Sequence, residues 1–218
     1  MIPITITLTI ITIIVSLLAF NNQETMDRLI FYPPAITKDK QFYRFITSGF
    51  IHADMMHLAF NMLSFYFFSI LVEPKFIEYF GDWGRATYFI MYILALIVSI
   101  LPTYYKNANN RNYRSLGASG AVSAVVFAGL MISPLSMIGF FIIPPIIPGF
   151  IFGPLYLLCS AYLDRKGGGN VNHSAHIWGA LFGVVFITIA TRLFSHEDIW
   201  ASFVDQVKYY FHVKFNIG

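Results

Sequence analysis

Charged residues are scarce in this chain of 218 residues. Asp, Glu, Lys and Arg together make up 11% of the sequence, whereas an ordinary soluble domain carries about 25%. Hydrophobic residues make up 57%, and no polar stretch is long enough to fold as a second soluble domain. This composition predicts a single polytopic membrane domain.

Other absences exclude further classes of protein. The net charge of +3 comes from scattered residues, so nothing indicates a nucleic-acid partner. The single cysteine, Cys159, cannot form an internal disulfide and lies within an apolar segment, where it is best interpreted as a small hydrophobic residue.

Metal chemistry is the main alternative to the catalytic interpretation developed below. His52, Asp54 and His57 could join His173 or His176 in a zinc site with an open position. The chain has no His-Glu-x-x-His motif, however, and its apolar segments hold almost no carboxylates. We therefore expect no metal and no organic cofactor.

Six apolar segments have about the length that a helix needs to cross a bilayer, roughly 20 residues. They cover residues 4–20, 55–72, 85–101, 118–133, 148–163 and 175–194. The first alternates Ile and Thr like a strand, but an isolated strand in lipid leaves its backbone unpaired, so we expect a helix. It also lacks the basic start and cleavage site of a signal peptide. The predicted fold class is an all-α membrane protein, a bundle of six transmembrane helices.

The remaining segments divide the chain further. Residues 21–54, here called loop 1, are long and rich in aromatic residues, which predicts an ordered element at the membrane interface. Glu73-Pro74 and then Gly81-Asp-Trp-Gly84 are expected to end the second helix and start the third, and the prolines in 134–148 exclude one regular helix there. We expect residues 1–194 to form the membrane domain and residues 195–218 a short interfacial or soluble tail.

Alternating helix directions bring four polar residues to one face of the membrane. The second, fourth and sixth helices begin on the same side; His57 and Asn61 lie in the first turns of the second, Ser119 starts the fourth and His176 starts the sixth. Polar groups at membrane depth are costly and usually line a water-accessible cavity. These four residues therefore form the candidate site.

Ser119 is the candidate nucleophile. A serine in a membrane helix is most often structural, but Gly117 and Gly120 allow a sharp turn and the close approach of a substrate backbone. The free N–H groups at a helix start also attract negative charge. The pattern Gly-x-Ser-Gly alone is weak evidence.

His176 is the candidate base. Gly179 and Gly183 follow it on the same helical face, and small residues let helices pack closely. The alternative is a structural histidine that forms an interhelical hydrogen bond.

His57 and Asn61 are spaced i and i+4, so both side chains face the same way. They could donate hydrogen bonds to an oxyanion, or instead simply hold the second helix in place. His52 lies outside that helix and is expected to be solvated.

Together these motifs resemble the rhomboid family of intramembrane serine proteases. The resemblance covers nearly the whole chain, and its members occur in the expected order. They are Tyr43-Arg44 through His52, His57-Leu-Ala-Phe-Asn61, Glu78-Tyr-Phe-Gly81, Gly117-Ala-Ser-Gly120, and Ala175-His176 with Gly179 and Gly183.

The resemblance implies a six-helix core with a Ser119 and His176 dyad. It also implies an oxyanion hole formed by the Ser119 N–H with His57 and Asn61, and structural support from Gly117, Gly120, Gly179 and Gly183. The fifth helix with residues 134–148 would gate and cap the site. Substrates would be transmembrane proteins cut near a membrane boundary, and lipid the only other partner; the oligomeric state stays open.

Two features depart from the family. Several relatives carry an aromatic residue one turn after the nucleophile that stacks on the histidine, but this chain has Ser123 there. The loops on the candidate-site face hold nine basic residues against five on the other face, so the positive-inside rule would place that face in the cytoplasm. The resemblance implies the opposite, with the site opening to the non-cytoplasmic face of a membrane, taken here as a bacterial inner membrane.

Two other functions remain open. One is a catalytically silent rhomboid-like protein that binds transmembrane clients. The other is a small transporter, which would normally place carboxylates in its helices.

Overall fold

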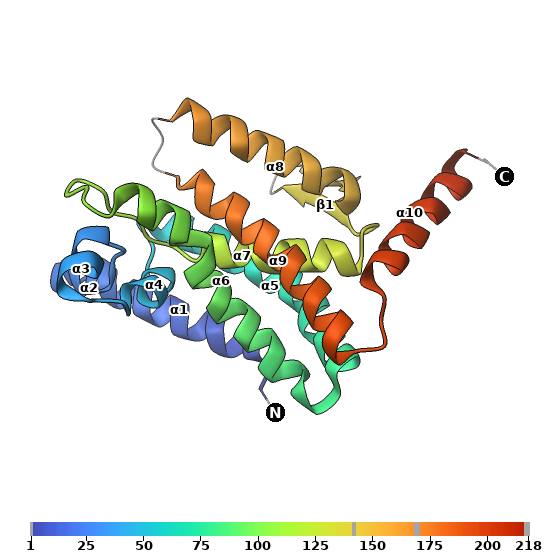
Figure 1. Ribbon diagram of the computed structural model, residues 1–218, viewed down its shortest axis with the longest axis horizontal. Coiled ribbons are helices and arrows are strands. Elements are labelled where there is room, and N and C mark those ends of the chain that lie inside the picture. Colours follow the sequence, from blue (N-terminus) through green and yellow to red (C-terminus); the bar gives the residue numbers. More distant parts are fainter. Residues whose placement is uncertain (1, 141–142, 168–170, 216–218) are drawn as a thin grey trace.

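A bundle of helices forms the body of the protein in the computed structural model, which describes residues 2–140, 143–167 and 171–215 (Figure 1). Helices occupy all six predicted apolar segments. Their bounds are α1 (Ile4–Phe20), α5 (Met55–Phe80), α6 (Gly84–Asn107), α7 (Ser119–Ile132), α8 (Gly149–Lys166) and α9 (His173–Phe194).

Helix α7 is the centre of the bundle. It packs against α5, α6 and α9, and 12 of its 14 residues are buried, so α7 has almost no surface left for lipid. Helix α8 is its opposite, with only four of 18 residues buried. The candidate site thus lies at the start of the central helix α7, with the peripheral helix α8 nearby.

Helix α5 is longer than the sequence predicts. It continues through Pro74 to Phe80 and ends at Gly81, whose φ of 57° is left-handed. The break therefore falls at the predicted Gly81-Asp-Trp-Gly84 segment, where α6 begins at Gly84, and Glu73-Pro74 does not interrupt the helix. Proline removes one backbone donor, a loss that a well-packed helix tolerates. The neighbouring Glu73 is buried and accepts hydrogen bonds from Ile4 N and Thr5 N at 2.8 and 3.0 Å, which caps the start of α1.

Loop 1 folds into short helices: α2 (Gln23–Leu29), α3 (Pro33–Asp39), α4 (Arg44–Thr47) and the 3₁₀ turn η1 (Ser48–Phe50). The buried Arg44 organises them, since its Nη1 donates to the carbonyls of Asp27 and Ile30 at 2.8 and 2.7 Å. A bridge between Phe31 and Ser115 ties loop 1 to the segment before α7. Loop 1 is thus an ordered part of the structure.

An antiparallel hairpin of β1 (Met137–Phe140) and β2 (Ile143–Pro148) follows α7. The expectation of an all-α fold is wrong here: the segment cannot be helical because of its prolines, and it pairs with itself instead. The hairpin part of the predicted cap packs near Leu130, at the end of α7 away from Ser119.

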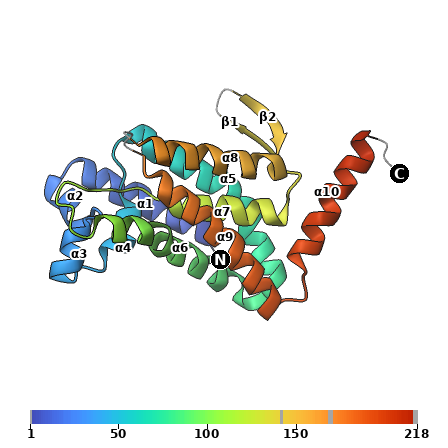
Figure 2. The ribbon, with the colours of Figure 1, turned by 45° about the horizontal axis from the view of Figure 1, so that its top comes forward.

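The tail forms α10 (Ile199–Phe215), which lies at the same end of the bundle as the hairpin, whereas loop 1 lies at the other end (Figures 1 and 2). Gln206 on α10 donates to the Ile132 carbonyl at 3.2 Å, and Phe150 packs against Tyr210 and Phe211. The tail therefore docks on the bundle end opposite loop 1.

Two helical stretches in the described residues, Met55–Asn107 and His173–Phe194, are long and apolar enough to cross a membrane by length and composition. Helices α1 and α7 are apolar but shorter.

Candidate active site

The start of α7 is held by the loops around it. Gly117 N donates to the Ser48 carbonyl at 2.9 Å, which fixes the turn to loop 1. The φ of Gly117 is 109°, a conformation that other residues rarely adopt. Ser119 follows as the first residue of α7 and is half-buried, so its hydroxyl and its backbone N–H both lie at the open start of the helix.

At two glycines the backbone of α9 comes into direct contact with that of α7. A Cβ added at Gly179 would overlap the Gly120 carbonyl oxygen, and one added at Gly183 would overlap that of Ala124. These contacts bring the first turns of the two helices together, with His176 one turn before Gly179. Within the described part of the chain, no hydrogen bond joins Ser119 Oγ to the His176 ring; catalytic hydrogen bonds are often long in free enzymes.

The start of α9 is fixed by Asn172. Its side chain caps the helix by accepting from Ala175 N at 3.1 Å and exchanges hydrogen bonds with Thr103 on α6. The His176 backbone is thus anchored to two neighbouring helices.

His57 faces the Gly117 turn. Its Nδ1 accepts a long hydrogen bond from Ala53 N at 3.5 Å, which leaves the other ring nitrogen, Nε2, to carry the proton. A Cβ at Gly117 would lie 2.9 Å from that Nε2, so this atom borders the turn before Ser119. The geometry makes His57 a donor at the start of α7.

Asn61 lies one turn below His57 and is buried. Its Nδ2 donates to the His57 carbonyl at 3.0 Å, which uses one of the two amide hydrogens. The second hydrogen can serve an oxygen atom in the site.

His52 is fully buried, so the expectation that it is solvated is wrong. Its Nε2 accepts from Ala118 N at 3.4 Å, its Nδ1 pairs with Ser16 Oγ at 3.0 Å, and Ser16 donates in turn to the Phe50 carbonyl. Burial, with a smaller effect of His57, lowers the pKa of His52 to about 3. A neutral imidazole therefore links α1 to Ala118, the residue before Ser119. Sequence reasoning missed it because nothing marks a loop histidine as buried.

Ser123 does not contact His176 as the aromatic residue of relatives would; an aromatic residue from α8 does. The Tyr156 and His176 rings stack with centroids 6.3 Å apart and planes at 24°. Tyr156 Oη also lies 3.0 Å from Ser123 Oγ. No spacing pattern in the chain pointed to this residue.

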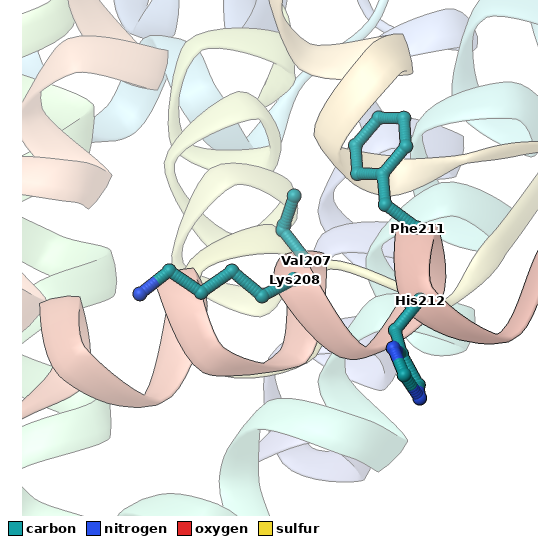
Figure 3. A pocket seen from close by; sticks show the side chains of 4 residues that line it. All are labelled: Val207, Lys208, Phe211 and His212. Atoms are coloured by element: carbon teal, nitrogen blue, oxygen red, sulfur yellow. The ribbon is translucent and has the colours of Figure 1, made fainter. Parts of the chain in front are cut away.

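Elsewhere the described residues carry no comparable chemistry. A shallow hollow of about 370 Å³ on α10 is lined by Val207, Lys208, Phe211 and His212, whose side chains point in different directions (Figure 3). Across the described residues, no three His, Cys, Asp or Glu side chains gather as a metal site would require.

Residues 39–193 match the family model described as the Rhomboid domain. The chain belongs to the rhomboid family. It is accordingly a membrane protein, and the match spans α5 to α9 while leaving out α1 and α10.

The chain is similar to several curated rhomboid proteins. It is 34% identical over 160 residues to Rhomboid-like protein 11, chloroplastic, of Arabidopsis thaliana, covering 69% of this chain and 53% of that protein. It is 28% identical over 172 residues to Presenilin-associated rhomboid-like protein A, mitochondrial, of Danio rerio, covering 78% of this chain and 42% of that protein. This chain thus spans about half the length of these relatives. Their names place them in organelles, so they give no support to the expected bacterial inner membrane.

Proposed function

We propose that this chain is an intramembrane serine endopeptidase that cleaves transmembrane proteins near a membrane boundary. The observation that carries the proposal is the backbone contact of α7 and α9 at Gly120 and Gly179, because it holds Ser119 and His176 at neighbouring helix starts. The helix starts that carry Ser119 and His176 lie at the same end of the bundle as loop 1.

The site lies below the surface of the membrane in this proposal. Helices α1, α5, α6, α7, α8 and α9 cross the bilayer, and residues 195–218 form a separate tail on the far side. With 14 residues, α7 is about 21 Å long at 1.5 Å per residue, roughly 9 Å short of the hydrocarbon thickness. We place the other end of α7 at the opposite boundary of the bilayer, so that the nucleophile at its start lies within the membrane, and we place this end on the non-cytoplasmic side.

The reaction begins when Ser119 Oγ attacks the scissile carbonyl and His176 takes the hydroxyl proton. A dyad suffices because a base within reach raises nucleophilicity as the bond forms. His176 then gives the proton to the leaving amine as the peptide bond breaks. Water hydrolyses the acyl ester on Ser119, and the free serine is restored.

Three donors stabilise the negative charge on the carbonyl oxygen. They are the Ser119 N–H, the Nε2–H of His57 and the second amide hydrogen of Asn61. Loss of one such donor lowers kcat by about 10² to 10³-fold in serine proteases. The substrate reaches them laterally between α5 and the peripheral α8, unwinding locally to present an extended strand.

The decisive experiment is cleavage of a model transmembrane substrate by the purified wild type and by Ser119→Ala and His176→Ala. Both variants should bind the substrate but not cut it, and product masses should give one cut site near a membrane boundary. Ser174→Ala, a neighbouring half-buried serine on α9, is the matched control and should retain activity. Undiminished cleavage by Ser119→Ala would refute the dyad.

A catalytically silent protein is the second candidate, favoured by the missing hydrogen bond between Ser119 and His176 in the described structure. A fluorophosphonate probe separates the two functions, since only an activated serine reacts with it. Labelling that is lost in Ser119→Ala supports the protease. Binding of transmembrane clients without labelling supports the silent protein.

A further inference from the structure

Two rings contact His176: Tyr156 comes from α8, and His173, on the same helix as His176, meets it edge-on with centroids 5.8 Å apart. Tyr156 is the nearly parallel one, offset from the imidazole with a centroid distance of 6.3 Å and an interplanar angle of 24°. Aromatic rings attract one another over about 4.5 to 7 Å and prefer such offset stacks. The contact thus limits how the His176 ring can turn.

The Tyr156 hydroxyl is itself held in a defined direction. Ser123 Oγ donates its only hydrogen to the Ser119 carbonyl at 2.9 Å, so in the 3.0 Å contact between the two hydroxyls Tyr156 is the donor. Phe127 and Phe152 pack against the same ring with centroids 5.6 and 5.7 Å away. The phenol is therefore fixed both at its tip and along its sides.

We propose that Tyr156, anchored by Ser123, is the positioning residue for His176 in this chain. The proposal rests on the proposed function, because it assigns a supporting role within the Ser119 and His176 dyad. Because Ser123 has a small side chain, the place of an aromatic residue beside His176 is taken by the Tyr156 ring from α8. The serine that replaces the family's aromatic residue thus has a use as the hydrogen-bond acceptor that fixes Tyr156.

The test compares Tyr156→Leu, which removes the ring, with Tyr156→Phe, which removes only the hydroxyl. Tyr156→Leu should lower kcat by about 10 to 100-fold, the scale that a 1 Å misplacement of a catalytic group produces, with KM nearly unchanged. Tyr156→Phe should lose less than about 10-fold, since one neutral hydrogen bond contributes modestly. The labelling rate of Ser119 by a fluorophosphonate should fall in the same order.

Tyr162→Leu is the matched control, because Tyr162 lies on the same helix and is 65% exposed. It should leave kcat unchanged. The double variant Ser123→Tyr with Tyr156→Leu restores a ring from α7, as in relatives, and should recover most of the lost activity. Recovery separates positioning from a general loss of folding.

A second measurement does not depend on activity. Ring currents of a stacked phenol shift the NMR signals of the His176 imidazole, which are identified by their loss in His176→Ala. The shift should persist in Tyr156→Phe and vanish in Tyr156→Leu.

Active wild type with an equally active Tyr156→Leu would overturn this inference and leave the proposed protease standing. Wild type that shows the ring-current shift but neither labels nor cleaves would refute the protease and keep the contact. An imidazole signal that is the same with and without the Tyr156 ring would refute the positioning role outright.

Discussion

At the scale of single residues, the turn before Ser119 leaves little freedom for substitution. Gly117 combines a left-handed backbone with contact to the His57 ring, where an added Cβ would lie 2.7 Å from Cε1. The first property affects the free energy of folding, and the second affects the position of His57, the proposed oxyanion donor. A suitable pair of variants can separate these effects.

Gly117→Ala should lower cleavage by about 10² to 10³-fold, because it displaces one oxyanion donor. Gly81→Ala is the control: its φ of 57° is also left-handed, but no atom lies within 4 Å of the added Cβ. Both variants should lose about 1 to 2 kcal/mol of folding free energy through backbone strain. Cleavage rates and thermal unfolding midpoints give the two effects, and equal activities would contradict the steric argument.

His52 makes stability depend on pH. Since burial lowers the pKa of His52 to about 3, the folded ring stays neutral while the unfolded ring titrates near about 6.5. The unfolded state therefore binds the extra proton between these values. Stability is lost as the pH falls below about 6.5, at up to about 1.4 kcal/mol per pH unit.

His52→Ala should cost about 1 to 3 kcal/mol at pH 7.5, because it leaves the buried Ala118 N–H and Ser16 hydroxyl without this partner. The difference in unfolding midpoint between variant and wild type should narrow at pH 5. There only the wild type loses stability, because its unfolded state binds a proton at His52. His196→Ala, an exposed histidine in the tail, should behave like the wild type. A gap that is constant with pH would contradict the titration of His52.

The end of the bundle at which a polar residue lies could be predicted where the order of the helices determines it. The order of the helices predicts that Ser119, His176, His57 and Asn61 share one end of the bundle, and the structure brings the helix starts that carry them together there. Tyr156 could not be found in this way, because its contact depends on how α8 leans on α9 and not on spacing along the chain.

At the scale of elements, apolar length predicted the helices well and their ends poorly. Helix α1 has the predicted bounds, whereas α5 runs eight residues past Val72 to Phe80. Pro74 was expected to end helix α5, but tertiary packing decides whether a helix continues past a proline. Residues 134–148 show the same limit of prediction, since their prolines excluded a helix but did not predict the hairpin that forms.

The buried Glu73 offers a test of how α1 is attached to α5. Glu73→Gln keeps the shape but removes the charge that faces the N–H groups of Ile4 and Thr5, so we expect a loss of about 1 to 2 kcal/mol. Glu78→Gln removes an exposed carboxylate that pairs with Lys75 on the same helix and should cost less. Unfolding midpoints in detergent compare the two, and an equal loss would contradict a capping role for Glu73.

At the scale of the whole molecule, the ends of the bundle differ in kind. Loop 1, the turn before α7 and the start of α9 gather at one end, while the hairpin and α10 occupy the other (Figure 2). Family membership could be inferred from motif order along the chain. The placement of the hairpin and α10 at the end opposite loop 1 could not be inferred in this way, because the docking of α10 depends on contacts between residues far apart in sequence.

Orientation in the membrane follows from which end reacts with an external reagent. In a Cys159→Ser background, Asn109→Cys marks the loop 1 end and Asp82→Cys marks the turn between α5 and α6, both at exposed positions. A membrane-impermeant maleimide added to the non-cytoplasmic side should label only Asn109→Cys. The reverse pattern would place the site in the cytoplasm, as the positive-inside rule implies.

The backbone contact of α7 with α9 also bears on how the protein responds to its lipid. A bilayer that is too thick or too thin is accommodated by tilting helices or by local deformation of the lipid. Helices α7 and α9 meet carbonyl to glycine at Gly179 and Gly183, so this contact cannot rearrange by rotating side chains, whereas most of α8 is exposed. Changing acyl-chain length should therefore alter how readily a substrate enters while the spacing of nucleophile and base stays constant.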